Sequence, residues 1–496
     1  MDERPGPEEW RYHYAHPCDW EQDFPPLAMT EMFVMSVARY GERVLAEFLG
    51  REFTYRQIAT EARRFAAGLQ ALGIGKGDRV GLCLPNVPVY ISAYFGVLMT
   101  GATLVHFPPL DTAAELAAQV SDSGTRLLVT LDVPALLPAA EQVLRETGLE
   151  WLVVARLARQ LPFWKGVGLH LLRRREILPV PDGANIFEWS ELLLDPVSRP
   201  VTVDPLTDIA LLHYTGGTTG RPKGAMLSHQ NLTANARQME MIDPHAHVRD
   251  VRMGVLPFVD IFANASVLNR TVYDGGTIAM LPRFAAADVL ATLERVKATV
   301  MSGVPAMFEA LLDDPRMART DFSALFTCLS WGAPLPGRIK ARFERASGAK
   351  LVDGYGLAEA GGVVAANPLD GLQKVGSIGH PLPGTDLRLL DRNDPARDAA
   401  PDEPGELAVS GPQIMCGYWN RPEAAAQAFV ERDGHRWLRT GDIATIDEEG
   451  YVRLVGGTRE NAASGGLHVW PGPAETGRPA AVAATFVRKA LGPNLP

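Results

Sequence analysis

One glycine-rich and hydroxyl-rich segment has the residue types best suited to chemistry. The run Tyr214-Thr-Gly-Gly-Thr-Thr-Gly-Arg-Pro-Lys-Gly224 follows an apolar, strand-like stretch over 209–212. Its glycines let backbone N–H groups turn toward an anion, its threonine hydroxyls add donors, and Lys223 adds a positive charge. A flexible surface turn is the alternative, but composition, spacing and the preceding strand together predict a phosphate-binding loop.

The loop differs from the common nucleotide-binding loop, in which adjacent glycine and lysine precede a metal-binding Ser or Thr. Here Lys223 lies between Pro222 and Gly224. In this arrangement the segment resembles the signature loop of acyl-adenylate-forming enzymes. That family includes acyl-CoA synthetases, luciferases and peptide-synthetase adenylation modules.

Further motifs resemble the same family, in the same order, over most of the chain. Ser330-Trp-Gly-Ala-Pro-Leu-Pro336 resembles its adenine-contacting turn, and Asp353-Gly-Tyr-Gly-Leu-Ala-Glu-Ala360 its aromatic and acidic motif. Gly405-Glu-Leu and Trp437-Leu-Arg-Thr-Gly-Asp442 resemble the next two. The residues implied to bind ATP or AMP are Thr215, Gly216, Gly217, Thr218, Thr219, Gly220, Lys223, Gly332, Ala333, Pro334, Asp353, Gly354, Tyr355, Gly356, Ala358 and Asp442.

The resemblance assigns particular roles to some of these residues. Tyr355 is expected to stack on adenine and Asp442 to accept hydrogen bonds from the ribose. Glu359 and Thr215 are expected to share a magnesium ion, since this cation takes oxygen ligands. Taken alone, Glu359 is typical of a solvated acid at a helix start and Asp442 of a turn. Their roles therefore depend on the ordered set of motifs.

The reaction that the resemblance implies is the ATP-dependent activation of a carboxylic acid. The acid attacks the α-phosphorus of ATP to give acyl-AMP, and the thiol of coenzyme A then takes the acyl group. Lys223, Thr215 and Glu359 are expected to catalyse it by positioning and electrostatics. The opening segment from Cys18 resembles bacterial long-chain fatty acyl-CoA ligases. An AMP-forming acid–thiol ligase for a medium- or long-chain fatty acid, using ATP, Mg2+ and coenzyme A, is therefore expected.

Three departures from the family lie close to the implied reaction centre. Asp260 stands where the family usually has histidine, and a buried unpaired carboxylate there is expected to be costly. Trp331 replaces a small residue and is expected to shorten or block the acyl channel. Asp260, Phe262 and Trp331 are the residues expected to line the acyl pocket. Ala358 replaces a Thr or Ser, which removes one hydroxyl from the phosphate site.

The largest departure lies near the end of the sequence. The segment Val455-Gly-Gly-Thr-Arg-Glu460 resembles the family hinge but has Gly457 at the usual arginine. A match to the start of the mobile domain follows, but the lysine-bearing motif is absent, and Lys489 lacks its flanking glycine. We expect 456–496 to form a hinge and an incomplete α+β domain, with impaired activity. Two alternatives stay open: a degenerate, non-catalytic adenylate-binding protein, and an acyl-AMP ligase that loads a carrier protein.

Length and patterning predict the architecture. The chain has 496 residues, 46% of them hydrophobic, which is typical of a multidomain globular protein. Helical and strand periodicities alternate over 31–130 and again over 209–383, whereas 384–455 contains short strands and polar turns. We predict the α/β class: two doubly wound α/β subdomains and a β-rich one, together forming a large domain over 1–455.

Charge and apolar patterning bear on partners and location. The net charge of -10 disfavours nucleic acid as a partner. The four widely spaced cysteines and an acidic, proline-containing start predict a reduced, cytoplasmic protein without an export signal. The uncharged run 87–110 predicts a buried helix, a turn and a strand. The basic, apolar segment 155–195 is either an inserted helix with a solvated face or a peripheral contact with the inner membrane face. The oligomeric state stays open.

Overall fold

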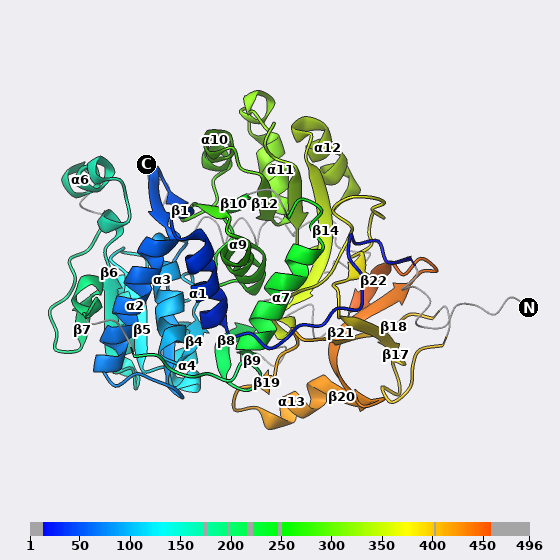
Figure 1. The fold of residues 1–496 in the computed structure, drawn as a ribbon, viewed down its shortest axis with the longest axis horizontal. Helices are drawn as coiled ribbons and strands as arrows, with labels where there is room; N and C mark the ends of the chain where they lie inside the picture. Colours follow the sequence, from blue (N-terminus) through cyan, green and yellow to red (C-terminus); the bar gives the residue numbers. More distant parts are fainter. Residues whose placement is uncertain are drawn as a thin grey trace, which may run out of the picture.

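The chain folds around three β-sheets. The computed structural model describes residues 13–172, 176–195, 199–215, 222–246, 250–400 and 403–457. In these residues two large sheets lie beside each other with helices packed on them, and a smaller antiparallel sheet adjoins the second (Figure 1). The architecture confirms the predicted α/β class with a β-rich part. The proposed domain boundary at 455 stays a prediction, because 458–496 lie outside the described residues.

The first large sheet has the strand order β19-β9-β8-β4-β3-β5-β6-β7. Its strands are β3 (Arg79–Leu82), β4 (Thr103–His106), β5 (Leu127–Leu131), β6 (Trp151–Ala155), β7 (Ile186–Glu188), β8 (Ile209–Thr215), β9 (Lys223–Ser228) and β19 (Gly417–Tyr418). Neighbours from β8 to β7 are parallel, and β9 and β19 add antiparallel pairs. The helices of this part are α2 (Tyr55–Ala71), α3 (Pro88–Met99), α4 (Ala113–Ser123), α5 (Leu137–Glu146) and α6 (Phe163–Leu172).

The second large sheet has the strand order β16-β15-β14-β13-β12-β10-β11-β1-β2. Its strands are β1 (Val44–Phe48), β2 (Arg51–Thr54), β10 (Val251–Gly254), β11 (Thr277–Met280), β12 (Val300–Gly303), β13 (Thr327–Ser330), β14 (Lys350–Leu357), β15 (Gly362–Ala366) and β16 (His380–Pro381). The helices of this part are α1 (Met29–Tyr40), α7 (His229–Met241), α8 (Ile261–Ala263), the π-helix η5 (Asn264–Asn269), α9 (Arg270–Asp274), α10 (Ala286–Val296), α11 (Pro305–Asp313) and α12 (Gly337–Ser347).

The smaller sheet is antiparallel throughout and follows the order β17-β18-β21-β20, with β22 paired to β21. Its elements are β17 (Asp386–Leu390), β18 (Gly405–Ser410), α13 (Pro422–Ala428), β20 (Phe429–Arg432), β21 (His435–Ile446) and β22 (Val452–Gly457). Single-turn 3-10 helices lie at η2 (Leu157–Arg159), η4 (Trp189–Leu192), η6 (Met317–Arg319) and η7 (Ala358–Ala360).

The two large sheets exchange strands, which the order of motifs along the sequence did not predict. β1 and β2 come early in the chain but belong to the second sheet, where Ala46 pairs with Ile278 of β11. β8 and β9 follow much later but belong to the first sheet, where Leu211 pairs with Leu104. Local periodicity reports the type of each element but not its partner. The two α/β subdomains are therefore interleaved rather than consecutive.

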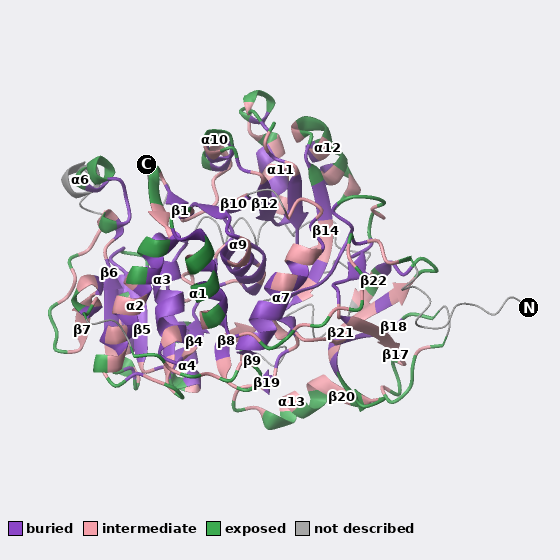
Figure 2. Ribbon diagram, viewed as in Figure 1, coloured by how far each residue is buried: buried purple, intermediate pink, exposed green. Residues whose placement is uncertain are grey.

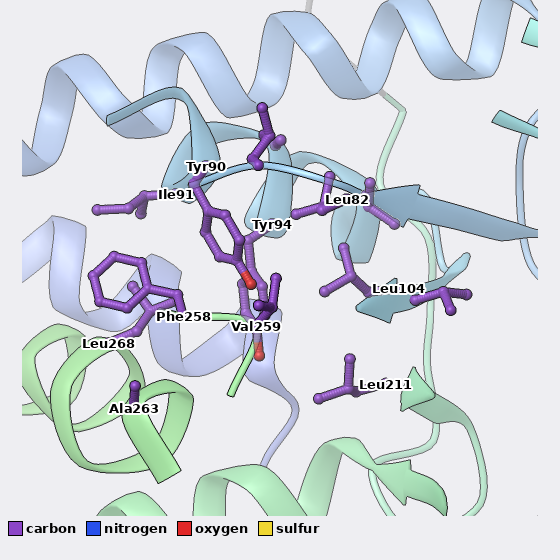
Figure 3. Packing of buried hydrophobic residues seen from close by; sticks show 14 of the residues in the cluster. Leu82, Tyr90, Ile91, Tyr94, Leu104, Leu211, Phe258, Val259, Ala263 and Leu268 are labelled. Atoms are coloured by element: carbon purple, nitrogen blue, oxygen red, sulfur yellow. The ribbon is translucent and has the colours of Figure 1, made fainter. Parts of the chain in front are cut away.

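The uncharged run over 87–110 forms a buried helix, a turn and a strand, as predicted. Helix α3 is apolar on all sides and is buried from Pro88 to Leu98, as expected for a helix without a polar face. Figure 3 shows its Tyr90 and Tyr94 packed near Phe258 and Val259, between strands of the first sheet and the helix that follows Asp260. In the described part of the chain, no helix has the length and apolar character needed to span a bilayer.

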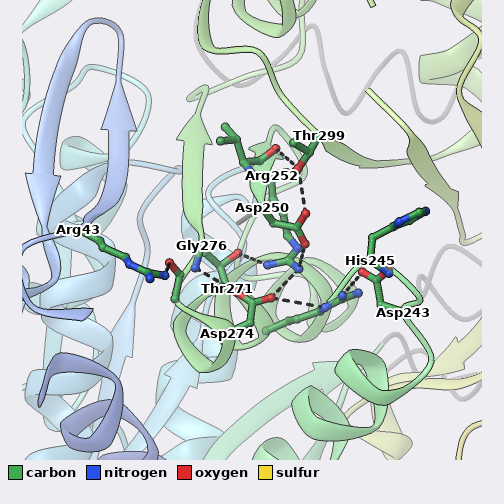
Figure 4. A network of polar contacts seen from close by, with 12 residues as sticks. Arg43, Asp243, His245, Asp250, Arg252, Thr271, Asp274, Gly276 and Thr299 are labelled. Atoms are coloured by element: carbon green, nitrogen blue, oxygen red, sulfur yellow. Dashed lines mark hydrogen bonds and ion pairs between the residues drawn. The ribbon is translucent and has the colours of Figure 1, made fainter. Parts of the chain in front are cut away.

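A buried ion cluster joins the segment between α7 and β10 to β10 and α9 in the second part (Figure 4). The Arg252 guanidinium lies 2.6 Å from the Asp274 carboxylate and also pairs with Asp250, and Arg270 pairs with Asp243. None of these five side chains is more than 9% exposed. Charges removed from water to this extent are stable only when they are paired and hydrogen-bonded. Figure 2 shows the surrounding elements as largely buried.

Candidate nucleotide and acyl site

The hairpin of β8 and β9 positions the two described ends of the predicted phosphate loop. β8 ends at Thr215, β9 begins at Lys223, and these two residues are partners in the antiparallel register. The Thr215 hydroxyl lies 3.4 Å from the Lys223 carbonyl oxygen, which it donates to. Both side chains are half-buried, so both face partly toward solvent. The predicted contacts of Gly216, Gly217, Thr218, Thr219 and Gly220 lie outside the described residues and stay predictions.

A short segment between β18 and α13 completes the edge of the first sheet beside this hairpin. In β19, Tyr418 pairs with Ala225 of β9, and the Trp419 N–H donates to the Gly224 carbonyl oxygen at 2.8 Å. The Met415 N–H donates to the Glu359 carbonyl oxygen, also at 2.8 Å. Residues 415–421 therefore connect the loop hairpin to the backbone of the predicted magnesium ligand.

Lys223 and Glu359 converge on the same aromatic side chain. The Tyr418 hydroxyl donates to Glu359 Oε1 at 2.7 Å, and Lys223 Nζ lies 5.4 Å from the centroid of the Tyr418 ring. Burial, followed by the Glu359 charge, raises the pKa of the Tyr418 phenol, so the phenol stays a proton donor. The half-buried Glu359 carboxylate and the Thr215 hydroxyl are oxygen donors of the kind that magnesium prefers. These residues therefore fit the implied ion in chemical type.

The residues predicted to contact adenine and ribose lie together. The Tyr355 hydroxyl of β14 donates to Asp442 Oδ2 of β21 at 2.6 Å. Burial raises the pKa of Tyr355, and the neighbouring Asp442 carboxylate adds to this effect. Tyr355 is only 3% exposed, so protein covers its ring in this conformation. Stacking of Tyr355 on adenine and binding of ribose by Asp442 stay predictions.

Asp353 links the adenine-turn motif to the aromatic motif. Its carboxylate accepts a hydrogen bond from the Leu335 N–H at 3.3 Å, and burial raises its pKa to about 7. The next residue, Gly354, faces the Trp331 ring, and an added Cβ would lie 2.5 Å from that ring. Glycine is therefore required at 354 by the bulk of Trp331.

The other residues of these motifs lie in turns beside the same elements. Gly332 has φ of 78°, the left-handed region that favours glycine. Ala333 is half-buried and Pro334 is exposed. An added Cβ at Gly356 would lie 2.0 Å from the Gly362 carbonyl oxygen, and Ala358 begins the turn that carries Glu359. Nucleotide contacts by these residues stay predictions.

Asp260 is neither unpaired nor fully enclosed, so the cost expected for a buried unpaired carboxylate does not arise. Asp260 is the N-cap of α8, and its Oδ1 accepts hydrogen bonds from the N–H groups of Phe262 at 2.9 Å and Ala263 at 3.3 Å. An aspartate in this position satisfies amide groups that a helix start leaves free. The side chain is also half-buried rather than fully enclosed.

Phe262 and Trp331 form an aromatic wall next to Asp260. Their ring centroids lie 4.2 Å apart with an interplanar angle of 34°. Trp331 is 3% exposed and packs in an apolar cluster with Met239, Ile242 and Val363. The structure thus brings Phe262 and Trp331 into contact. The lining of an acyl pocket by Asp260, Phe262 and Trp331 stays a prediction.

Two groups at the site were missed from the sequence. One is Tyr418. The other is Asp122 of α4, which accepts hydrogen bonds from the Tyr214 hydroxyl at 2.7 Å and from Arg421 at 2.6 Å. Its backbone oxygen accepts from the Trp419 indole at 3.1 Å. Tyr418 could have been found from the sequence as part of the aromatic pair that follows Gly417 shortly before a helix. Asp122 has no distinguishing local pattern.

In this α/β fold, Tyr418 joins Glu359 to the Thr215–Lys223 hairpin, and Tyr355 is joined to Asp442. These contacts define a candidate nucleotide site. A family model described as "AMP-binding enzyme" matches residues 33–419. The chain belongs to this AMP-binding enzyme family.

Curated relatives and solved structures agree with this assignment. A long-chain-fatty-acid–CoA ligase of Bacillus subtilis is 36% identical over 468 residues, covering 93% of this chain and 82% of the relative. A feruloyl-CoA synthase of an Amycolatopsis species is 34% identical over 428 residues, covering 86% and 78%. Among solved structures, an anthranilate CoA ligase in complex with anthranoyl-AMP has a TM-score of 0.75 at 23% identity, covering 88% of this chain and 79% of that one. A long-chain-fatty-acid-CoA ligase from Archaeoglobus fulgidus has a TM-score of 0.74 at 24% identity, covering 88% and 85%.

Proposed function

We propose that this protein activates a medium- or long-chain fatty acid with ATP to form acyl-AMP, and then transfers the acyl group to coenzyme A. The observation that carries the proposal is the convergence of Lys223 and Glu359 on Tyr418 beside the Thr215 hairpin. The long-chain-fatty-acid–CoA ligase relative, which aligns over most of both chains, supports the substrate and the acceptor.

In the first half-reaction a carboxylate oxygen of the acid attacks the α-phosphorus of ATP, a carboxyl–phosphate bond forms, and pyrophosphate leaves. Lys223 stabilises the negative charge that moves toward the departing pyrophosphate, and the fold holds the reactants in line. Asp442 accepts hydrogen bonds from the ribose. Thr215 and Glu359 would hold magnesium, which supplies positive charge to the phosphates when it is bound. In the second half-reaction the thiol attacks the acyl carbonyl carbon and AMP leaves.

An aromatic acid is the second candidate substrate. Trp331 fills space beside Phe262 and forces glycine at 354, and an aromatic wall suits a planar ring as well as an alkyl chain. A relative named feruloyl-CoA synthase supports this candidate.

ATP–pyrophosphate exchange tests the first half-reaction. The purified chain is assayed with magnesium and a panel of acetate, octanoate, palmitate and ferulate, beside Lys223→Ala and the surface control Lys297→Ala. Acid-dependent exchange that is lost only in Lys223→Ala supports the proposal, and the acid that gives it names the substrate class. Retained ATP binding without exchange for any acid would instead favour a non-catalytic adenylate-binding protein.

The acceptor is tested separately, because a carrier protein can replace coenzyme A in related chemistry. Acyl-AMP made by the chain is mixed with free coenzyme A or with a pantetheine-bearing carrier protein, and the thioester is quantified by mass spectrometry. We expect acyl-CoA to form. Transfer to the carrier alone would identify an acyl-AMP ligase.

We also propose that helix α6 makes a peripheral contact with an anionic membrane surface, at the cytoplasmic face. Phe163 is 85% and Trp164 70% exposed, and Val167 is 42% exposed. Lys165 and Arg51 lie beside them, held by carbonyl oxygens of Leu49 and Leu161 at 3.0 and 3.3 Å. Exposed aromatic rings flanked by cations are typical of helices that bind the bilayer interface.

Vesicle flotation tests this contact. We expect binding to vesicles of phosphatidylglycerol but not of phosphatidylcholine alone, and loss of binding in Phe163→Ser/Trp164→Ser. The control Leu206→Ser changes an exposed leucine outside α6 and should bind like the wild type. Equal flotation of all three proteins would contradict the proposal.

A further inference from the structure

Tyr418 stands between two oppositely charged groups that act on the same ligand. Its hydroxyl donates to Glu359 Oε1 at 2.7 Å, and its ring lies 5.4 Å from Lys223 Nζ. We infer that Tyr418 is a positioning residue that keeps the Glu359 carboxylate apart from the Lys223 ammonium and holds that carboxylate ready for the metal–ATP complex. The inference deepens the proposed function and depends on its nucleotide site.

The backbone fixes Tyr418 to the strand that carries Lys223. Tyr418 pairs with Ala225 in the antiparallel register of β19 and β9. On either side of it, Cys416 donates to the Met226 carbonyl oxygen and Trp419 to that of Gly224, both at 2.8 Å. The backbone of Tyr418 is therefore fixed relative to β9, the strand that begins at Lys223.

Separation of the two charges has a chemical purpose. Without Tyr418 between them, the lysine and the glutamate would form a direct ion pair. That pair would engage the ammonium group that phosphate needs and the carboxylate oxygens that a metal ion needs. Among the described residues, neither Lys223 nor Glu359 forms an ion pair. The phenol adds no charge of its own, and its single hydrogen bond to Oε1 leaves Oε2 of Glu359 available to a cation.

The aromatic ring also favours the ammonium group without neutralising a carboxylate. A cation within about 6 Å of a ring centroid is attracted to the face of that ring. Lys223 can thus leave the ring for a phosphate without breaking a salt bridge. Tyr418 therefore stabilises both the Glu359 carboxylate and the Lys223 ammonium group in the absence of the nucleotide. It leaves both groups free to bind the metal–nucleotide complex.

Manganese binding tests the inference independently of turnover. Free Mn2+ is quantified by electron paramagnetic resonance in the presence of α,β-methylene-ATP for the wild type, Tyr418→Phe and Tyr418→Leu. Loss of one hydrogen bond to the carboxylate should weaken manganese binding about fivefold in Tyr418→Phe. Tyr418→Leu removes the ring as well, so Lys223 and Glu359 can pair, and binding should weaken further.

Tyr451→Phe is the matched control, since its hydroxyl also donates one hydrogen bond, to the Leu372 carbonyl oxygen at 2.7 Å, outside the site. Its manganese affinity should equal that of the wild type. In active protein, Tyr418→Phe should raise the magnesium concentration for half-maximal exchange by a similar factor and leave the KM for the acid unchanged.

The possible results separate the inference from the proposed function. Wild-type manganese affinity in both Tyr418 variants, or an equal loss in Tyr451→Phe, would overturn the positioning role. Absence of exchange in the wild type with every acid would overturn the proposed activity, while the manganese titration would still decide the role of Tyr418. A wild type that binds no manganese with the ATP analogue would overturn both.

Discussion

The buried ion cluster of the second sheet and the charged groups at the phosphate-loop hairpin contain similar residues in opposite arrangements. In the cluster, Arg252 and Arg270 each pair with carboxylates, and all five side chains are at most 9% exposed. At the hairpin, Lys223 and Glu359 are half-buried and are kept apart by Tyr418. The charges of the buried cluster are neutralised by ion pairs within the fold, whereas the charges that we propose to bind the nucleotide and its metal ion form no ion pair among the described residues.

The largest expected effect on stability comes from removing one arginine of the buried ion cluster. Arg252→Leu removes the guanidinium that pairs with Asp250 and Asp274 and leaves buried negative charges close together. We expect the free energy of unfolding to fall by about 3–5 kcal/mol, measured by urea denaturation. Lys297→Ala breaks an exposed ion pair with Asp321 and should leave the midpoint of urea denaturation nearly unchanged, because water screens this pair. Similar losses in both variants would remove the distinction between the two regions.

Removal of the Lys223 charge at the hairpin should have the opposite pattern, with a large effect on activity and a small effect on stability. Lys223→Ala should lower the rate of ATP–pyrophosphate exchange by about 100- to 1000-fold, the usual effect of removing one charge-stabilising group. The free energy of unfolding should change by no more than about 0.5 kcal/mol, because the ammonium group is not ion-paired within the described residues. Destabilisation as large as that of Arg252→Leu would show that Lys223 is a structural charge.

A pH-dependent effect is expected at Asp353, where burial raises the pKa of the carboxyl to about 7 from an ordinary value of 3.8. The folded state then binds a proton more tightly than the unfolded state, so this group stabilises the fold at low pH and loses that contribution as pH rises from about 4 through 7. Asp353→Asn should abolish this slope and should be more stable than the wild type at pH 8.5, by on the order of 2 kcal/mol. Parallel stability curves for the two proteins between pH 5 and 8.5 would refute this assignment.

The smallest effect is expected at the base of the loop. Tyr214→Phe deletes one hydrogen bond to Asp122, 2.7 Å long and partly buried, and should cost about 1 kcal/mol. The rate of ATP–pyrophosphate exchange should fall only a few-fold, because Arg421 still forms its hydrogen bond to Asp122. Urea denaturation and exchange assays measure the two effects, and a loss of exchange comparable to that of Lys223→Ala would place Tyr214 in direct contact with the reactants.

Sequence motifs predicted the chemistry better than they predicted the contacts. The glycine-rich loop, Glu359, Tyr355 and Asp442 stand in recognisable strings, and the structure brings Tyr355 to Asp442 and Lys223 near Glu359. Tyr418 was missed because its role depends on pairing between β19 and β9, segments about 190 residues apart that no local pattern connects. The hydrogen bonds of Asp260 were not foreseen because the helix start that it caps was not recognised from the sequence.

The strand exchange was also beyond local patterns. The apolar run at 209–212 identified β8 as a strand, and alternating periodicity over 31–130 indicated an α/β protein, but parallel partners are selected by packing across the whole chain rather than by neighbouring residues. The fold class was therefore predictable, and the assignment of strands to sheets was not.

The exchange of β1 and β2 into the second sheet also sets the order of events on the ribosome. β1 pairs with β11, which is synthesised about 230 residues later, so an apolar strand must wait about 10 to 50 seconds before its partner exists, at translation rates of about 5–20 residues per second. Until then its hydrogen-bonding edge is open to other chains. Slowed translation between β2 and β11 should therefore increase aggregation of the newly made protein, and a chaperone that shields extended apolar segments should reduce it.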